Sequence, residues 1–132
     1  MKENKVITIV GTGVIGAGWA ARFLAKGYTV KAYDPNSVSR KQLKINVRNA
    51  FKSIKKIGLN KNASLKNLNV FSKLPSALKD TTFVQENAPE NEKIKKNVLK
   101  QIDSLVDKSV IIASSSSGLL PSKIQLACKF PE

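Results

Sequence analysis

The chain has 132 residues, 42% of them hydrophobic, and a formal net charge of +14 from 23 basic and 9 acidic residues. This length corresponds to one domain with its own core, and the hydrophobic content excludes a disordered chain. No apolar run approaches the roughly 20 residues that span a bilayer, and residues 1–10 lack a signal-peptide pattern. We therefore expect a cytoplasmic protein without a membrane partner.

The first 34 residues predict a β-α-β unit. Residues 6–10 are a β-branched run typical of a buried parallel strand. Residues 16–25 predict a closely packed helix that ends at Gly27, and residues 29–33 predict a second strand. Within this helix, we interpret Trp19 as a packing residue; stacking on a cofactor is the alternative.

The rest of the chain continues to alternate between helices and strands. Helices are predicted over residues 39–57, 75–78 and 91–106, and strands over 70–71, 82–85 and 110–113, with a loop at 59–67, a polar turn at 114–117 and a last short helix after Pro121. In the helix over 39–57 we expect a core face of Leu43, Val47, Ala50, Phe51, Ile54 and Ile57. In the helix over 91–106 we expect a core face of Ile94, Val98, Ile102 and Leu105. This order predicts an α/β fold of the Rossmann type, a doubly wound and mainly parallel sheet with right-handed crossovers.

Cysteine and histidine content limits the chemistry of the chain. Cys128 is the only cysteine and there is no histidine, which excludes an internal disulfide and a zinc site built on histidine, and we expect no metal. We interpret Cys128 as a partly buried thiol; a nucleophile is the alternative, but no histidine base accompanies it.

The positive charge comes almost entirely from lysine, since Arg22, Arg40 and Arg48 are the only arginines. Eleven asparagines accompany the lysines, which indicates a compositional bias of the source genome. The lysines are spread along the chain without an aromatic-rich basic segment. We therefore expect a solvated basic surface, with a specific polyanion site as the alternative and nucleic acid as an unfavoured partner.

A glycine motif lies between the first strand and the first helix. It is the segment Gly11, Thr12, Gly13, Val14, Ile15 and Gly16, a GxGxxG. Gly11 permits a tight turn, Gly13 lets a pyrophosphate approach the backbone, and Gly16 lets the helix lie close to the sheet. The helix N-terminus offers N–H groups and a positive dipole end to phosphates.

Asp34 completes the dinucleotide signature, because it ends the second strand 18 residues after Gly16. A carboxylate at this position accepts hydrogen bonds from ribose hydroxyls and repels a 2′-phosphate, which favours NAD over NADP. A structural turn in which Asp34 caps the backbone is the alternative.

Three stretches of the chain carry a resemblance to a known family: residues 11–24, 83–90 and 111–122. They resemble the N-terminal NAD-binding domain of the L-3-hydroxyacyl-CoA dehydrogenase family, over essentially the whole chain. The last two resemble its carnitine dehydrogenase branch more than its acyl-CoA branch, which prefers Val-Glu-Ala near residues 85–88 and Asn-Thr-Ser-Ser near 115–118. The serine-rich element also recurs in the gulonate dehydrogenase and lambda-crystallin group, so the hydroxy-acid substrate stays open.

The resemblance implies roles for four further residues. It places Glu86 near the nicotinamide ribose, with Asn91 close to the same region. It assigns Ser117 to a hydrogen bond with the reacting oxygen and Ser115 to the neighbouring polar position. The alternatives are a surface acid that caps the next helix for Glu86 and turn chemistry alone for Ser117.

The resemblance also implies what the 132 residues leave out. In the family, a histidine oriented by a glutamate follows the equivalent of residues 130–132, and a helical domain closes the substrate site and forms most of the dimer contact. We expect residues 1–132 to be an NAD-binding domain, incomplete relative to the family, that binds NAD without turnover. Self-association through its uncovered apolar surface is a further expectation. An acyl-CoA enzyme, with the basic helix of Lys44, Arg48, Lys52 and Lys55 at the CoA phosphates, and a non-catalytic NAD-binding module are the alternatives.

Overall fold

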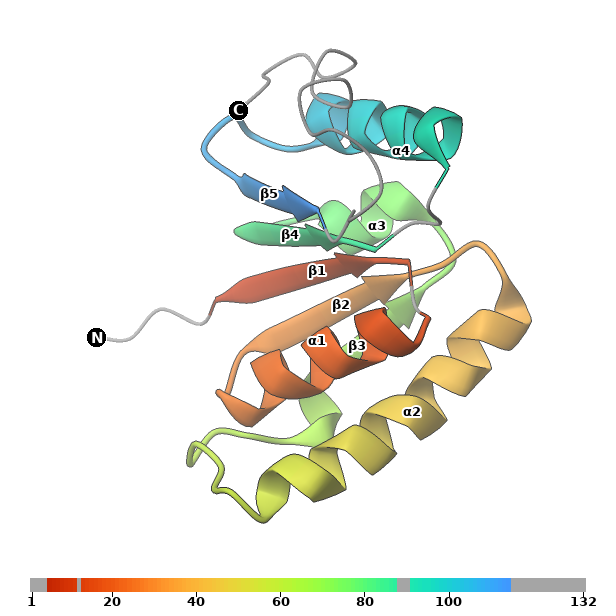
Figure 1. Ribbon diagram of the computed structural model, residues 1–132. Coiled ribbons are helices and arrows are strands. Elements are labelled where there is room, and N and C mark those ends of the chain that lie inside the picture. The colour runs from red at the N-terminus through yellow and green to blue at the C-terminus, as the bar shows by residue number, and fades with distance from the viewer. Residues whose placement is uncertain (1–4, 12, 88–90, 115–132) are drawn as a thin grey trace.

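The computed structural model describes residues 5–11, 13–87 and 91–114 and contains five parallel strands with helices on both faces (Figure 1). The strands are β1 (Val6–Val10), β2 (Thr29–Tyr33), β3 (Leu68–Phe71), β4 (Phe83–Glu86) and β5 (Ile111–Ser114). The helices are α1 (Val14–Ala25), α2 (Ser37–Lys55), α3 (Leu74–Leu78) and α4 (Glu92–Leu105), and a short 3-10 turn spans Leu65–Asn67.

The sheet has the order β3-β2-β1-β4-β5, and every neighbouring pair is parallel. This is the doubly wound arrangement that the sequence predicts. The order reverses between β1 and β4, since the chain first builds outward from β1 to β3 and then returns to the other side of β1. In open α/β sheets, such a reversal leaves a crevice at the carboxyl ends of the strands, where ligands bind.

The two faces of the sheet have separate apolar cores. Ile7 and Ile9 of β1 lie in the cluster that α1 and α2 cover, whereas Val10 and Val84 lie in the cluster with α3 and α4. This alternation follows from the two-residue period of a strand. The face of α2 is as predicted for Leu43, Val47 and Phe51, which are buried.

Two predicted features of the helices are wrong in detail. Ile57 follows the end of α2 and is 88% exposed, because α2 stops at Lys55. The core face of α4 is only partly as predicted, since Ile102 is buried and Val98 packs against the core, but Ile94 and Leu105 do not belong to it. Its buried residues are Lys95, Leu99, Ile102 and Asp103, whereas Ile94 and Leu105 are 43% and 46% exposed.

The turn and loop predictions hold at the helix ends. Gly27 and Gly58 follow α1 and α2 with φ of +88° and +128°, the left-handed region that suits glycine after a helix. Ser114, which the sequence assigns to a turn, is the last residue of β5. Cys128 and the helix predicted after Pro121 lie outside the described residues. In the described part of the chain, none of the helices has the length and hydropathy needed to cross a membrane.

Thr8 is a buried polar residue in the centre of the sheet. Its hydroxyl donates to the Ala77 carbonyl at 2.8 Å and lies 2.8 Å from the Thr81 hydroxyl, which joins β1 to α3 and to the turn before β4. Both threonines are buried, so water cannot replace this hydrogen bond, and losing it costs free energy of folding.

Replacing Thr8 by Val keeps the shape of the side chain but leaves the Ala77 carbonyl without this donor. We expect the free energy of unfolding to fall by about 1–3 kcal/mol, measured by urea denaturation. Thr82→Val is the matched control, because the Thr82 hydroxyl donates to the Val6 carbonyl at 3.0 Å from an exposed position. Equal losses in both variants would show that burial of the Thr8 hydroxyl is unimportant.

Candidate functional site: a dinucleotide cleft

The turn between β1 and α1 brings the end of the strand into contact with the start of the helix. Gly11 has a φ of +88°, and its N–H donates to the Tyr33 carbonyl at 2.9 Å, which ties the turn to the end of β2. A Cβ on Gly16 would lie 2.4 Å from the Gly11 carbonyl oxygen, a distance that no side chain tolerates. The backbone therefore requires glycine at both positions, as the motif predicts. Thr12 lies outside the described residues.

The N-terminus of α1 is open toward the carboxyl edge of the sheet. Gly13 is the N-cap residue, and in the described part of the chain no side chain caps it and no acid lies in the first turn. A Cβ added to Gly13 would meet nothing within 4 Å, and Val14 and Ile15 are 80% and 62% exposed. Glycine at position 13 is thus not required by the packing of the protein. Its absence of a side chain instead leaves space for an anion at the N–H groups of the helix.

Asp34 lies at the end of β2, beside the glycine turn. Its backbone N–H donates to the Phe71 carbonyl at 3.3 Å, and its Oδ1 accepts the Asn36 N–H at 2.9 Å. Asn36 in turn caps α2, since its side chain accepts from the N–H groups of Val38 and Ser39. Asp34 therefore does have the turn role considered as the alternative. This role holds the carboxylate at the strand end, where a ribose binds in this fold.

Arg40 is a neighbour of Asp34 that was not predicted from the sequence. Its Nη1 donates to the Asp34 carbonyl oxygen at 2.7 Å from the first turns of α2. Arg40 lies six residues after Asp34 in the sequence, and α2 starts between them. This spacing is the sequence signal that indicates the contact. The guanidinium places a positive charge close to the Asp34 backbone.

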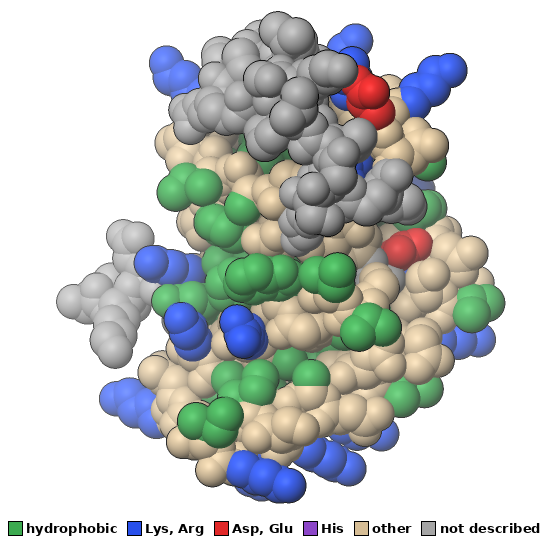
Figure 2. All heavy atoms as spheres, in the orientation of Figure 1, with side chains coloured by type: hydrophobic (Ala, Val, Ile, Leu, Met, Phe, Trp, Pro, Cys, Tyr) green, Lys and Arg blue, Asp and Glu red, His purple; other side chains and the backbone are tan. Residues whose placement is uncertain are grey.

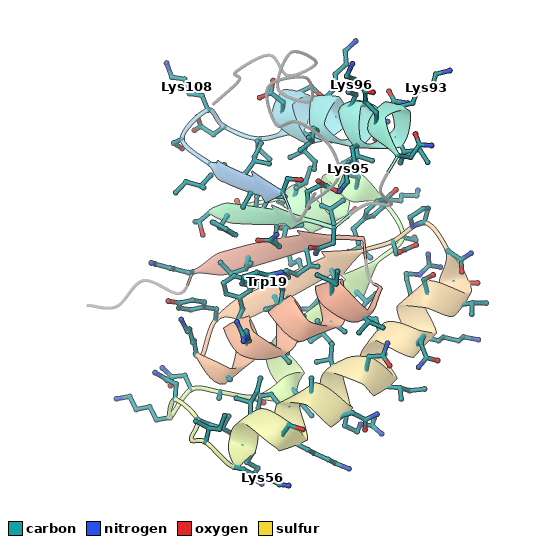
Figure 3. The ribbon with its side chains drawn as sticks, viewed as in Figure 1. Trp19, Lys56, Lys93, Lys95, Lys96 and Lys108 are labelled. Carbon is teal, nitrogen blue, oxygen red and sulfur yellow. The ribbon has the colours of Figure 1, made fainter. Side chains whose placement is uncertain are left out.

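Glu86 is buried at the end of β4, with a relative exposure of 0%. Lys95 Nζ of α4 lies 3.0 Å and 3.3 Å from its two carboxylate oxygens, and the Ser114 hydroxyl donates to Oε1 at 2.6 Å. In Figure 3, Lys95 points from α4 toward the sheet, whereas Lys93 and Lys96 extend to the outside. Glu86 is therefore not the surface acid considered as the alternative, and it does not cap α4. Lys95 and Glu86 are both fully buried, and their opposite charges balance each other.

Asn91 caps α4, because its side-chain oxygen accepts the Ile94 N–H at 3.1 Å. This role was not predicted, and it places the N-cap of α4 four residues before Lys95. Ser115 and Ser117 lie outside the described residues, although the preceding Ser114 ends β5 beside Glu86.

These elements meet at one edge of the sheet. Glu86 is in register with Val10 on one side and with Ser114 on the other, and the Asn87 N–H donates to the Val10 carbonyl at 2.7 Å. Asp34 continues the adjacent strand β2. The glycine turn, Asp34 and Glu86 thus follow three neighbouring strands, on both sides of the point where the strand order reverses.

The close approach at Gly16 predicts opposite effects on stability for two glycine-to-alanine substitutions in α1. Gly16→Ala forces the turn or the helix to move, and we expect a loss of about 1–3 kcal/mol in the free energy of unfolding. Gly18→Ala, in the same helix, meets nothing within 4 Å and is expected to stabilise by about 0.5–1 kcal/mol. Chemical denaturation of both variants provides the comparison; a Gly16→Ala variant as stable as Gly18→Ala would contradict the contact.

The buried pair predicts strong coupling between Lys95 and Glu86. Lys95→Met or Glu86→Gln alone leaves one buried group without its partner, at an expected cost of about 3–5 kcal/mol. The double variant should be destabilised by much less than the sum, which a double-mutant cycle of unfolding free energies measures. Additive losses would show that the two groups do not interact in solution.

Comparison with known proteins places this cleft in a family. Residues 6–132 match the family described as 3-hydroxyacyl-CoA dehydrogenase, NAD binding domain. An L-carnitine dehydrogenase from Bacillus cereus is 44% identical over 97% of this chain, which covers 39% of that relative's length. Further L-carnitine dehydrogenases, from Oceanobacillus iheyensis and Staphylococcus epidermidis, are 38% and 42% identical. The chain therefore spans about two fifths of the length of the curated relatives it matches.

Solved structures agree with this assignment. The crystal structure of 5-formyl-3-hydroxy-2-methylpyridine 4-carboxylic acid 5-dehydrogenase, an NAD+-dependent dismutase, has a TM-score of 0.89 and 30% identity, and the match covers 98% of this chain and 42% of that one. The architecture, the glycine turn and the sequence match lead to one conclusion: the chain belongs to the NAD-binding domain family of the 3-hydroxyacyl-CoA dehydrogenases.

Proposed function

We propose that residues 1–132 bind NAD as the cofactor domain of a 3-hydroxy-acid dehydrogenase whose substrate is L-carnitine or a close analogue. The observation that carries the proposal is the arrangement of the Gly11–Gly16 turn, the uncapped start of α1 and Asp34 on the carboxyl ends of adjacent strands. The names of the relatives support the choice of carnitine over an acyl-CoA substrate.

The residues present fit a dinucleotide at three points. The space beside Gly13 and the start of α1 suits the pyrophosphate, because the N–H groups and the helix dipole favour negative charge there. The Asp34 carboxylate suits the hydroxyls of the adenosine ribose and opposes a 2′-phosphate. The Glu86 carboxylate, held by Lys95 and Ser114, lies at the next strand end and suits the nicotinamide half.

The reaction requires a base for the hydroxyl proton, and the resemblance assigns this role to a histidine. Oxidation of a secondary alcohol transfers a hydride from carbon to NAD+ and releases the hydroxyl proton to a base, leaving a ketone and NADH. The 132 residues contain no histidine. We propose that Ser117 hydrogen-bonds the reacting oxygen and that the base comes from outside these residues. The chain alone is therefore expected to bind NAD and not to oxidise L-carnitine.

The acyl-CoA reaction is the second candidate, because the family description names it and the outer face of α2 is basic. Measuring the binding of acetoacetyl-CoA and of L-carnitine in the presence of NADH distinguishes the acyl-CoA reaction from the carnitine reaction. Binding of the CoA ester alone would favour the second candidate.

Cofactor choice is tested by titrating NADH and NADPH into the purified chain, followed by nucleotide fluorescence. We expect NADH to bind more tightly by about ten-fold or more, which corresponds to about 1.4 kcal/mol, because Asp34 repels a 2′-phosphate. Asp34→Ala should remove the preference, whereas Asp107→Ala, an exposed acid before β5 at the opposite edge of the sheet, should retain it. No binding of either nucleotide, or an unchanged preference in Asp34→Ala, would contradict the proposed site.

A further inference from the structure

The net charge of the chain lies in one part of it. Residues 4–79 contain 15 of the 23 basic residues and one of the nine acidic residues, Asp34, so the remainder of the chain has eight of each. The whole excess of +14 therefore belongs to the segment that forms β1, α1, β2, α2, β3 and α3. The lysines are spread along the chain, but the acids are not. In Figure 2, Lys and Arg side chains surround the C-terminal half of α2 and the loop after it, and no acidic side chain is visible there.

On α2 the charges form a stripe. Six cations at three- and four-residue spacing fall within about 120° of the helix circumference and extend over about 22 Å. They are Lys41, Lys44, Arg48, Lys52, Lys55 and the C-cap residue Lys56. Each of these residues is an i,i+3 or i,i+4 neighbour of another, and α2 contains no acid, so the stripe disfavours the helix unless an anion compensates it. Lys56 points away from the molecule in Figure 3.

A groove continues from the end of α2. It has a volume of about 1150 Å³ and is lined by Ile54, Ile57 and Gly58 at the end of α2, by the C-terminal half of α1 and by the residues before β1 and β2. These segments lie at the amino ends of the strands, opposite the glycine turn and Asp34. A ligand in this groove therefore leaves the dinucleotide cleft accessible.

The groove combines aromatic rings with cations. Trp19, Phe23 and Tyr28 form a continuous row, with centroids 5.9 Å and 6.2 Å apart. Figure 3 labels Trp19 beside α1, and Figure 2 shows an apolar band across the centre of the same view. Three basic side chains border these rings. They are Lys5, at 5.8 Å from the Tyr28 ring, Arg22, at 5.9 Å from the Trp19 ring, and Lys26. None of the described residues that line the groove is acidic.

This chemistry fits one class of polyanion better than the others. A cationic track for phosphates beside aromatic rings for bases is how proteins hold single-stranded nucleic acid without sequence preference. A bilayer is flat and cannot enter the groove. The apolar face of α2, with Leu43, Val47 and Phe51, is buried in the core, and the two exposed apolar side chains of the helix, Val38 and Ile45, are too few to insert into a bilayer. An acidic polypeptide would pair with the cations but lacks planar bases for the aromatic row.

We propose that the α2 stripe and the aromatic groove bind single-stranded nucleic acid, with phosphates along α2 and bases against the Trp19 row. The proposal does not depend on the dehydrogenase activity. Because the groove lies at the amino ends of the strands, opposite the glycine turn, NADH and the polynucleotide bind at the same time.

The test uses a fluorescein-labelled 20-nucleotide oligo(dT) and the purified chain in an anisotropy titration over a series of salt concentrations. Replacing Lys44, Arg48 and Lys52 with Gln should weaken binding by about ten-fold or more and reduce the salt slope by about 2, since each phosphate contact on a single strand contributes about 0.7. The matched control replaces Lys93, Lys100 and Lys108 with Gln, three exposed lysines in the part of the chain with no excess charge. This control should change the affinity by less than about two-fold.

Trp19 provides a direct readout of the groove, because it is the only tryptophan of the chain. We expect the oligonucleotide to quench its fluorescence, and saturating NADH to leave the anisotropy titration unchanged. Equal weakening by the stripe and control variants would overturn the proposal, as it would reveal only diffuse attraction to the net charge. Binding of a duplex as tightly as the single strand, or binding of phosphatidylserine vesicles without the oligonucleotide, would also overturn it.

Competition experiments identify the remaining alternatives. Displacement of the oligonucleotide by stoichiometric CoA would overturn the proposal and assign the stripe to the phosphates of an acyl-CoA. Displacement by NADH would overturn it as well, because the oligonucleotide would then occupy the dinucleotide cleft. Circular dichroism melting curves that match the unmodified chain establish that each variant is folded.

Discussion

The contact between Gly11 and Gly16 is the constraint on which the dinucleotide cleft depends. With 2.4 Å between the Gly11 carbonyl oxygen and a Cβ at position 16, α1 can start immediately above the end of β1 only if residue 16 has no side chain. This close start directs the helix axis at the carboxyl edge of the sheet and brings its N–H groups to the strand ends. The hydrogen bond from Gly11 to Tyr33 then fixes the same turn to β2, so that Asp34 lies beside it.

A second constraint holds the other side of the cleft. Glu86, Lys95 and Ser114 join β4, α4 and β5 through contacts of 3.3 Å or less, of which those between Glu86 and Lys95 are buried. Such buried pairs contribute little net stability compared with apolar packing, but they penalise every arrangement in which one partner is missing. The position of β5, and with it the start of the serine-rich segment, is therefore coupled to the carboxylate at the end of β4.

Periodicity and glycine chemistry were sufficient to predict a doubly wound, parallel sheet and all five strands to within two residues. They also predicted the glycine turn and the acid beside it. The prediction was wrong where a charged residue took a core position. The apolar pattern of α4 favoured Ile94 and Leu105, whereas the buried carboxylate of Glu86 turns Lys95 inward and rotates the helix. A sign of this was present in the sequence, since Lys95 lies four residues before Leu99 and seven before Ile102. The aromatic groove was not predictable from any one segment, because Lys5, the end of α1 and the end of α2 meet only in three dimensions.

Gly13 provides the most direct measurement of the central claim, that the turn exists to hold a dinucleotide. Its φ of −53° is allowed for any residue, and an added Cβ meets no protein atom within 4 Å. Calorimetric titration of NADH into Gly13→Ala, together with its urea denaturation curve, separates binding from folding. We predict an unfolding free energy within about 1 kcal/mol of the unmodified chain, since alanine is the poorer N-cap residue, and an NADH affinity at least about ten-fold lower. NADH binding as tight as that of the unmodified chain would contradict the account, because the pyrophosphate would then not lie against this glycine.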